Sequence, residues 1–344
     1  MNRSTAPFRI AAVIALVTLA CDDSTGPEYP DPGPGPHFSV VPVPIETLAR
    51  ITPLGHMGIV MPNPHTYWHT CDYDPLLKSD RPCHLERQQI RAPGDGEIWD
   101  LSHHETDGFV TIHGPPGLFY TFGHVVPAPG LARGSRVEAG QVIGTMVFEH
   151  GFDFGMANHG ITHDFIRPER YHWGYLHGQH PIEQFPEPLR SQLTALVPTT
   201  DPDNPLGSYD WDVPGTAAGT WFSPNIPEVQ SLNVQYDTAW LWLGRLTEIQ
   251  SVRVASIGYL RKGMYMPELV ADPSAPDWED ITPGSGPVAI KLWYPLYPEG
   301  GPNLDRPGGT ILIQLENAMR LRFEYFPTHD PVGGFTENAR VYIR

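Results

Sequence analysis

The 344-residue chain is poor in charge, in cysteine and in long apolar runs. Only 18% of its residues are charged, and 39 acidic side chains against 22 basic ones give a formal net charge of −17. So few positive charges cannot neutralise a run of phosphates, which excludes nucleic acid as a partner and argues against adhesion to anionic lipid by charge alone. Proline and glycine, in contrast, number 39 and 34, which favours short strands and turns over long helices. We therefore expect a mainly β protein whose acidic surface serves solubility.

The apolar run near the N-terminus is too short to span a bilayer stably. Its eleven apolar or small residues, 10–20, follow Arg9 and end at Cys21, a length typical of the h-region of a signal peptide. Residues 18–21 (TLAC) are similar to a bacterial lipobox, with Thr18 at the usual leucine position. This pattern predicts an exported cell-envelope protein that is anchored in a membrane through a lipidated Cys21. An ordinary secretory signal cleaved near Ala20 is the alternative.

Cysteine is scarce, and its count agrees with export. If lipid takes Cys21, one pair remains, Cys71 and Cys83. In an oxidising compartment such a pair predicts a disulfide. Thiolate metal ligands are the alternative, but no CxxC spacing is present.

The distribution of histidine suggests two domains, because fourteen of the sixteen lie between His56 and His180. The predicted segments are a signal peptide with a lipobox (1–21), a disordered Pro/Gly-rich tether (22–46), a first domain (47–180), a helical linker (181–205) and a C-terminal β domain (206–344). Within the linker, Leu189, Leu193 and Leu196 predict a helix over residues 186–197.

The C-terminal segment alternates like an antiparallel β sandwich or barrel. Strands are expected at residues 241–243, 252–254, 311–315, 321–325 and 341–343. Six of the nine tryptophans fall in this segment. Packing in the core is their commoner fate, and a carbohydrate-binding platform is the alternative.

The first domain carries a set of short strands separated by glycines. The turn at residues 92–98 (APGDGEI) leads to expected strands at 108–113 and 118–126. A closing hairpin then reads G-x-x-V-x-x-G-x-x-I-G from Gly134 to Gly144, with small residues at turns and apolar ones where the chain must pack.

This order of motifs resembles the lysostaphin-type (LytM-like) zinc endopeptidases, whose fold is a barrel-sandwich hybrid, also called the duplicated hybrid motif. The resemblance covers about Thr52 to Asn158, less than a third of the chain. Biotinyl, lipoyl and phosphotransferase carrier domains share the hairpin, but no carrier lysine stands in it here. The resemblance implies a zinc site and peptidoglycan peptides as substrate class.

Carried over by position, the catalytic histidine of the family's Y-x-H segment falls on His124. The metal ligands fall on His65, His69 and Asp153, with His69 where the family has aspartate and Asp153 where it has histidine. Asp72 and Asp74 lie nearby but out of register. Aspartate can bind zinc, so this set is chemically feasible.

The second catalytic histidine of the family has no counterpart, because Gly151 stands at its position. His150 is adjacent, but a one-residue offset on a strand places it on the opposite face. A further group of histidines that includes His159 and His177 lies in an aromatic-rich segment, which favours a surface loop over a second metal site.

The resemblance and its defects together predict a degenerate endopeptidase domain that binds or scaffolds in the cell envelope without catalysis. Peptidoglycan or an envelope hydrolase is the expected partner. The alternative is an atypical zinc metallopeptidase that acts on peptidoglycan cross-links through His65, His69, Asp153 and His124.

Overall fold

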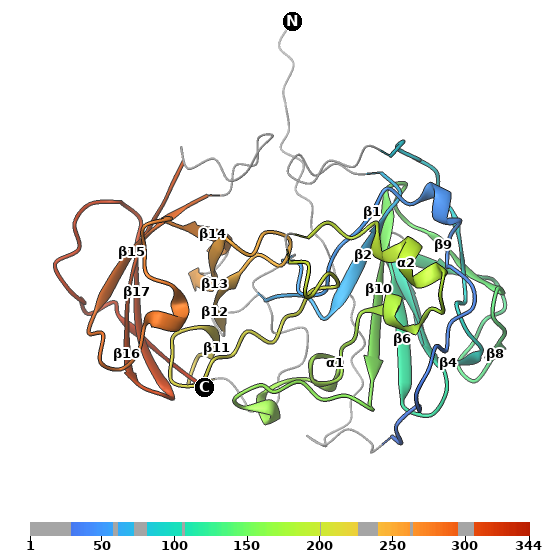
Figure 1. Ribbon diagram of the computed structural model, residues 1–344, viewed down its shortest axis with the longest axis horizontal. Coiled ribbons are helices and arrows are strands. Elements are labelled where there is room, and N and C mark those ends of the chain that lie inside the picture. Colours follow the sequence, from blue (N-terminus) through green and yellow to red (C-terminus); the bar gives the residue numbers. More distant parts are fainter. Residues whose placement is uncertain are drawn as a thin grey trace, which may run out of the picture.

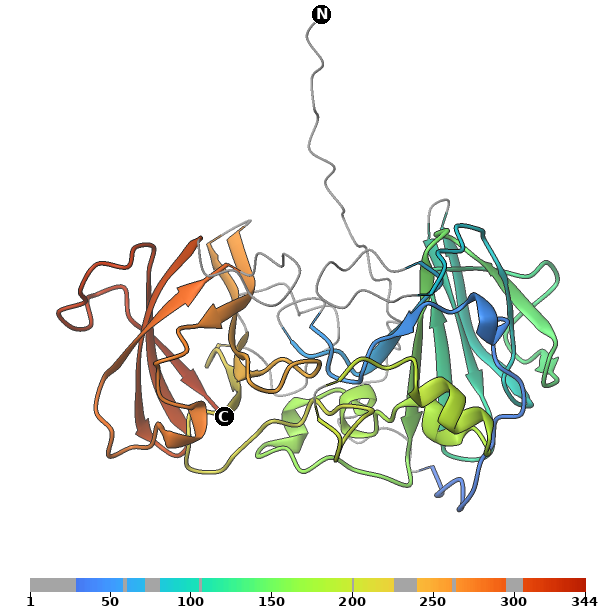
Figure 2. The same cartoon turned by 45° about the horizontal axis from the view of Figure 1, so that its top comes forward.

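The computed structural model describes residues 29–57, 61–71, 81–104, 107–199, 201–225, 240–261, 264–294 and 306–344. It shows two β lobes side by side, the N-terminal one in blue to green and the C-terminal one in orange to red (Figures 1 and 2). The expectation of a mainly β protein with barrel and sandwich architecture is confirmed. Cys21 and its lipobox lie outside the described residues. No helix among the described residues is both long and apolar enough to cross a membrane.

Two antiparallel sheets form the N-terminal lobe. The larger has the order β1-β2-β10-β6-β5-β4-β8 and the smaller β3-β9-β7. Their bounds are β1 Arg50–Ile51, β2 His65–His69, β3 Gln89–Arg91, β4 Gly96–His104, β5 Asp107–His113, β6 Leu118–Gly123, β7 Val125–Pro127, β8 Arg136–Val137, β9 Val142–Met146 and β10 Gly151–Asn158. Gly134 and Gly140 have φ values of +82° and +86°, so the chain turns at these glycines. The predicted hairpin between them is wrong, because β8 pairs with β4 in the larger sheet whereas β9 pairs with β3 and β7 in the smaller one.

The core of this lobe lies between the two sheets, because strand residues alternate between faces. Trp68 of β2 and Phe154 of β10 point inward, with ring centroids 5.3 Å apart, and Phe122 of β6 stacks on Phe154 at 4.5 Å. Ile90 and Ile143 of the smaller sheet join the same cluster. The intervening residues of β2 and β10 therefore face away from the core. They include His65 and Asp153, the polar residues of the candidate site.

The expected tether and linker are more ordered than predicted. Phe38 is only 2% exposed and packs against Tyr120, Phe154 and Phe185, so the tether ends before Phe38 and not at residue 46. The predicted linker helix is shorter, α2 Leu189–Thr194. Its Leu193 belongs to the N-terminal core, because its apolar side chain docks onto the sheets instead of bridging two domains.

The remaining helices are short. They are α1 Trp173–Leu176 and 3-10 turns at Ile45–Thr47, Pro168–Arg170, Pro181–Gln184 and Trp278–Asp280.

The C-terminal lobe is a closed antiparallel barrel of eight strands. The strands are β11 Gly219–Phe222, β12 Trp240–Arg245, β13 Arg253–Arg261, β14 Met264–Ala271, β15 Val288–Trp293, β16 Pro307–Asn317, β17 Arg320–Phe326 and β18 Arg340–Ile343. Every strand expected from the sequence lies here, with β13 beginning one residue later than predicted. Trp221 and Trp278 are fully buried in the barrel core, and Trp240 and Trp242 lie in the cluster between the lobes. Packing, the commoner fate of tryptophan, thus accounts for these four.

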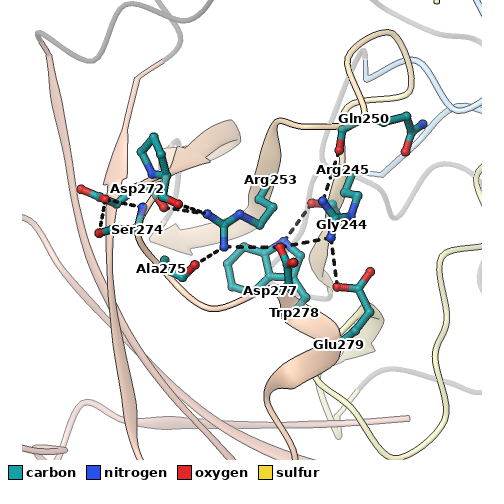
Figure 3. A network of polar contacts seen from close by, with 11 residues as sticks. Gly244, Arg245, Gln250, Arg253, Asp272, Ser274, Ala275, Asp277, Trp278 and Glu279 are labelled. Carbon is teal, nitrogen blue, oxygen red and sulfur yellow. Dashed lines mark hydrogen bonds and ion pairs between the residues drawn. The ribbon is translucent and has the colours of Figure 1, made fainter. Parts of the chain in front are cut away.

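Two arginines fasten one end of the barrel (Figure 3). Arg245 and Arg253 are paired across β12 and β13, and both reach Asp277, at 3.1 and 3.4 Å. Arg253 also donates to the carbonyls of Asp272 and Pro273, at 3.0 and 2.8 Å. Because these donors are taken by the loop after β14, the pair is a structural clamp and offers no anion site.

The lobes meet through an apolar cluster and one buried ion pair. The cluster joins Leu54, Met57 and Tyr175 to Phe222 and Trp240 of the barrel. Beside it, Nδ1 of His56 contacts Oε1 of Glu248, which the barrel contributes from the loop between β12 and β13. The charge of His56 and that of Arg50 lower the pKa of Glu248 despite its burial, which by itself raises that pKa. Glu248 thus fixes the barrel against the segment between β1 and β2.

Candidate functional site

Adjacent strands assemble the candidate site on the face of the larger sheet that points away from the core. Asp153 of β10 is paired with Tyr67 of β2 on one side and with Gly123 of β6 on the other. His65 of β2 is paired with Gly155, whose missing side chain leaves room for the imidazole, since a Cβ there would lie 3.0 Å from that of His65. His124 follows Gly123 directly.

His65 and Asp153 form the first pair of the site. Nε2 of His65 lies 3.7 Å from Oδ2 of Asp153. Burial lowers the pKa of His65, and the nearby Asp153 carboxylate only partly offsets this, so the imidazole is neutral near pH 7. His65 Nε2 and Asp153 Oδ1 are buried without a hydrogen-bond partner in the described part of the chain. Such atoms cost about 1–3 kcal/mol each when they stay unpaired, so the site favours a ligand that pairs them.

His124 interrupts a strand that the sequence predicts to run unbroken from residue 118 to 126. Its φ is +59°, the left-handed region that a residue with a Cβ seldom adopts. The pairing of β6 therefore ends at Gly123, and β7 begins at Val125 in the other sheet. Strained backbone of this kind costs about 1–3 kcal/mol and persists where surrounding contacts fix it. The break aims the imidazole at Asp153.

Two carboxylates hold the ring of His124. Nδ1 lies 3.0 Å from Oδ1 of Asp107 at the start of β5, and Nε2 lies 3.4 Å from Oδ2 of Asp153. Burial lowers the pKa of His124, but the charge of Asp153 and the hydrogen bond and charge of Asp107 outweigh burial and raise this pKa to about 9. His124 is therefore an imidazolium at neutral pH, whose Nδ1 donates to Asp107 and whose charge pairs with Asp153. No sequence pattern points to Asp107, because only the pairing of β5 with β6 brings it to His124.

His69, the remaining predicted ligand, is not brought to this cluster. It is paired with Arg50 across β1 and β2, and Nη2 of Arg50 lies 3.5 Å from Nε2 of His69. Because a guanidinium only donates, Nε2 of His69 accepts and the proton resides on Nδ1. Burial, followed by the charge of Arg50, lowers the pKa of His69 well below its usual value. Arg50 thus takes the lone pair that a metal would require.

The predicted zinc ligands do not form the three-ligand set that a family-type site requires. His65 and Asp153 are together, whereas His69 is engaged by Arg50. Among the described residues no group of three or more His, Cys, Asp or Glu side chains is arranged to hold a metal ion. Asp72 and Asp74 lie outside the described residues. We therefore derive no reaction step through zinc.

Gly151 cannot be replaced by a larger residue without a shift of the backbone. A Cβ at this position would lie 2.6 Å from the carbonyl oxygen of Trp68. His150 precedes β10, so the strand rule that would place it on the far face does not apply. The ring of Phe148 lies 4.9 Å from that of His124 and stacks on His150 at 5.4 Å. The sequence predicts His150 on the opposite face of the strand from the site, whereas the structure places it near His124.

A histidine at position 151 is expected to destabilise the fold instead of restoring the family's pattern. The close approach of the Trp68 carbonyl predicts that Gly151→His lowers the free energy of unfolding by about 2–3 kcal/mol. Chemical denaturation with Gly284→His as the control measures this, because a Cβ at Gly284 meets no atom within 4 Å and its φ is not positive. Equal losses in both variants would show that the β2 backbone yields freely.

The disulfide predicted from the cysteine count is present between Cys71 and Cys83. Cys71 follows β2 closely, and the amide of His84 donates to the carbonyl of Thr70 at 2.8 Å. The crosslink therefore ties the end of β2, and with it His69, to the segment that leads into β3.

Comparison with known proteins places the chain in no family. No protein-family model and no curated protein matches it. Among solved structures, it is similar to Csd3 of Helicobacter pylori in an orthorhombic crystal, with 20% identity over 37% of this chain and 33% of that one and a TM-score of 0.26. The hexagonal form gives 22% identity, 37% and 31% coverage and a TM-score of 0.27. The chain thus spans about a third of the length of these structures.

A similar likeness exists to pseudoalterin, described as an M23 metalloprotease from the deep sea. Its identity is 8% over 37% of this chain and 71% of that one, with a TM-score of 0.25. A structure of the SpoIIQ–SpoIIIAH pore-forming complex gives 11% identity, 36% and 85% coverage and a TM-score of 0.27. These are partial likenesses of fold, and they show neither the family nor the activity of this chain.

Proposed function

We propose that this chain is an exported cell-envelope protein whose N-terminal lobe binds peptides of the peptidoglycan type without cutting them. The single observation that carries the absence of cleavage is Gly151, where the Trp68 carbonyl leaves no room for a side chain. The family resembled in sequence uses a histidine at this position. The engagement of His69 by Arg50 supports the same proposal, because it removes the third metal ligand.

The unpaired atoms of the site suit a peptide group. Oδ1 of Asp153 accepts a hydrogen bond, and Nε2 of the neutral His65 can donate or accept. A peptide ligand offers an N–H and a C=O a few ångströms apart, so it can pair both atoms at once. Pairing them recovers the desolvation cost that the free site bears.

Attachment to the membrane completes the proposal. It rests on the lipobox-like residues 18–21 and on the short apolar run before them. A lipid on Cys21 would hold the lobe close to the membrane, within reach of the wall. An envelope hydrolase is the alternative partner for the same face.

Co-sedimentation with purified sacculi tests the binding. We expect the full-length protein to pellet with sacculi, and Asp153→Asn to lower the bound fraction at least tenfold. The exposed His103 of β4 gives a matched control, and His103→Ala is expected to bind as the native protein does. If the native protein, Asp153→Asn and the control pellet equally, the candidate site does not bind the sacculi and this part of the proposal is wrong.

A zinc hydrolase is the second candidate, favoured by the pairing of His65 with Asp153. Metal analysis of the purified protein and release of soluble wall fragments with added zinc separate the two. Stoichiometric zinc that is lost in His65→Ala, together with fragment release, would establish the hydrolase. Protein that pellets with sacculi but releases no fragments supports the function of binding without cleavage, whether or not a metal is bound.

A further inference from the structure

A ring of aromatic side chains encloses Tyr29 on the N-terminal lobe, apart from the candidate site. We call Trp99, His113, Phe119 and His159 the aromatic box. Their ring centroids lie 6.4, 5.5, 4.8 and 5.1 Å from that of Tyr29, and all four contacts are edge-on. Edge-to-face contacts of this kind are favourable beyond the burial of the rings. Tyr29 belongs to the Pro/Gly-rich segment that precedes the folded lobe.

The walls of the box support one another. His113 stacks on Phe119 at 4.5 Å with an interplanar angle of 8°. His159 stacks on His177 at 4.3 Å and on Trp173 at 5.8 Å. The walls come from β4, β5, β6 and the segments after β10, so the fold holds them in place without Tyr29.

The backbone around the box is shaped to receive a peptide. A Cβ at Gly117 would lie 2.0 Å from the carbonyl oxygen of Pro30, and one at Gly160 would lie 2.6 Å from Oδ1 of Asp31. Only glycine at these two positions allows the segment to approach so closely. Oδ1 of Asp31 also accepts from the amide of Gly33 at 2.8 Å, which turns the segment as it leaves.

Two buried nitrogen atoms of the aromatic box lack hydrogen-bond partners in the part of the chain that the structure describes, which is more typical of a binding site than of a packed core. Nε2 of His113 and Nε2 of His159 are buried and have no hydrogen-bond partner within the described residues. Apolar rings would fill the same volume without the cost of burying these unpaired polar atoms. Burial, then the neighbouring His177 and His113, lower the pKa of His159 to about 4, so the box is neutral near pH 7.

We propose that the aromatic box is a docking site for a Tyr-Pro-Asp peptide segment and is filled in cis by residues 29–31 of the tether. Docking fixes the point at which the tether leaves the lobe. From Cys21 the chain can reach at most about 29 Å to Tyr29, but about 61 Å to Phe38, the first buried residue that follows. Release from the box therefore doubles the greatest distance between the lobe and a membrane. This consequence for reach rests on the proposed lipid anchor, whereas the docking itself does not.

A synthetic peptide of residues 26–34 (GPEYPDPGP) added to the full-length protein tests the docking. In the native protein the tether competes at an effective concentration in the millimolar range, because a short linker joins it to its site. We expect calorimetry to show at least tenfold tighter binding of the peptide to Tyr29→Ala than to the native protein. Tyr29→Phe, which keeps the ring, is expected to behave as the native protein.

Two further measurements decide the outcome. The same peptide with alanine in place of tyrosine should not bind Tyr29→Ala, and adding Trp99→Ala to Tyr29→Ala should abolish binding by opening one wall. Circular dichroism checks that each variant is folded, and only folded variants are compared. If folded Tyr29→Ala binds the peptide no better than the native protein, or if the alanine peptide binds as well, the proposal is overturned. No wall material is involved, so such a failure leaves the proposed peptidoglycan binding untouched.

Discussion

Replacement of Asp153 by asparagine is expected to lower the free energy of unfolding by about 3 kcal/mol near pH 6. Asp153 is 7% exposed and lies within 3.7 Å of His65 and 3.4 Å of His124. Loss of its charge leaves a buried imidazolium with one carboxylate where it had two. Urea denaturation measures the change. Asp330→Asn, which removes the same charge from an exposed loop, should alter stability by no more than about 0.5 kcal/mol.

The contact between His124 and Asp153 also predicts how the free energy of unfolding depends on pH. The pKa of His124 rises from 6.5 in the unfolded chain to about 9 in the folded one. A raised folded pKa contributes stability that is complete below pH 6.5 and is lost as the pH rises through 9. The contribution is about 3 kcal/mol. In Asp153→Asn this decline should be smaller and should end at a lower pH, because only Asp107 remains to favour the imidazolium. An unchanged pH profile in the variant would contradict the pairing of His124 with Asp153.

Trp68→Ala is the second substitution with a large expected effect, a loss of about 3–5 kcal/mol. Trp68 is fully buried, its indole N–H donates to Oγ1 of Thr66 at 3.0 Å, and its ring contacts Phe152 and Phe154. Alanine leaves a cavity that rigid neighbouring strands cannot close. Calorimetric unfolding measures the loss, with Leu85→Ala as a control expected to change stability by no more than about 0.5 kcal/mol, because Leu85 is 49% exposed.

The consequence of Trp68→Ala for the site follows from alternation along β2. Trp68 points into the core so that Tyr67 and His69 point away from it, and its carbonyl limits the space at Gly151. We therefore expect the variant to lose binding to sacculi together with stability. A variant that loses less than 1 kcal/mol would mean that the two sheets are not packed around this ring.

Periodicity and turn chemistry made most of the fold predictable. The chain turns at Gly134 and Gly140, although the strands beside them join different sheets instead of forming a hairpin, and the alternating segments of the C-terminal half are barrel strands. The signals are local, because alternation and turn residues act within a few positions of one another. Closure of the barrel and the packing of Phe38 into the core were not predictable, because both depend on contacts between residues far apart in the chain.

The candidate site was predictable only in part. The resemblance to the LytM-like family implies one site with His65, His124 and Asp153, and the structure brings these three together. The same resemblance implies His69 as a further ligand, but strand pairing with β1 places it against Arg50. Spacing along one strand fixes the face on which a side chain lies, but neighbouring strands decide its partner.

The sequence by itself determined the β architecture, the acidic charge balance and the glycine at position 151, because composition, periodicity and residue identity are properties of the chain alone. Tertiary structure decided the rest. It broke the strand at His124, set that ring between Asp107 and Asp153, and closed the space above Gly151 with the Trp68 carbonyl. Charge states and steric limits arise from groups that only folding brings within a few ångströms, so no pattern along the chain could show them.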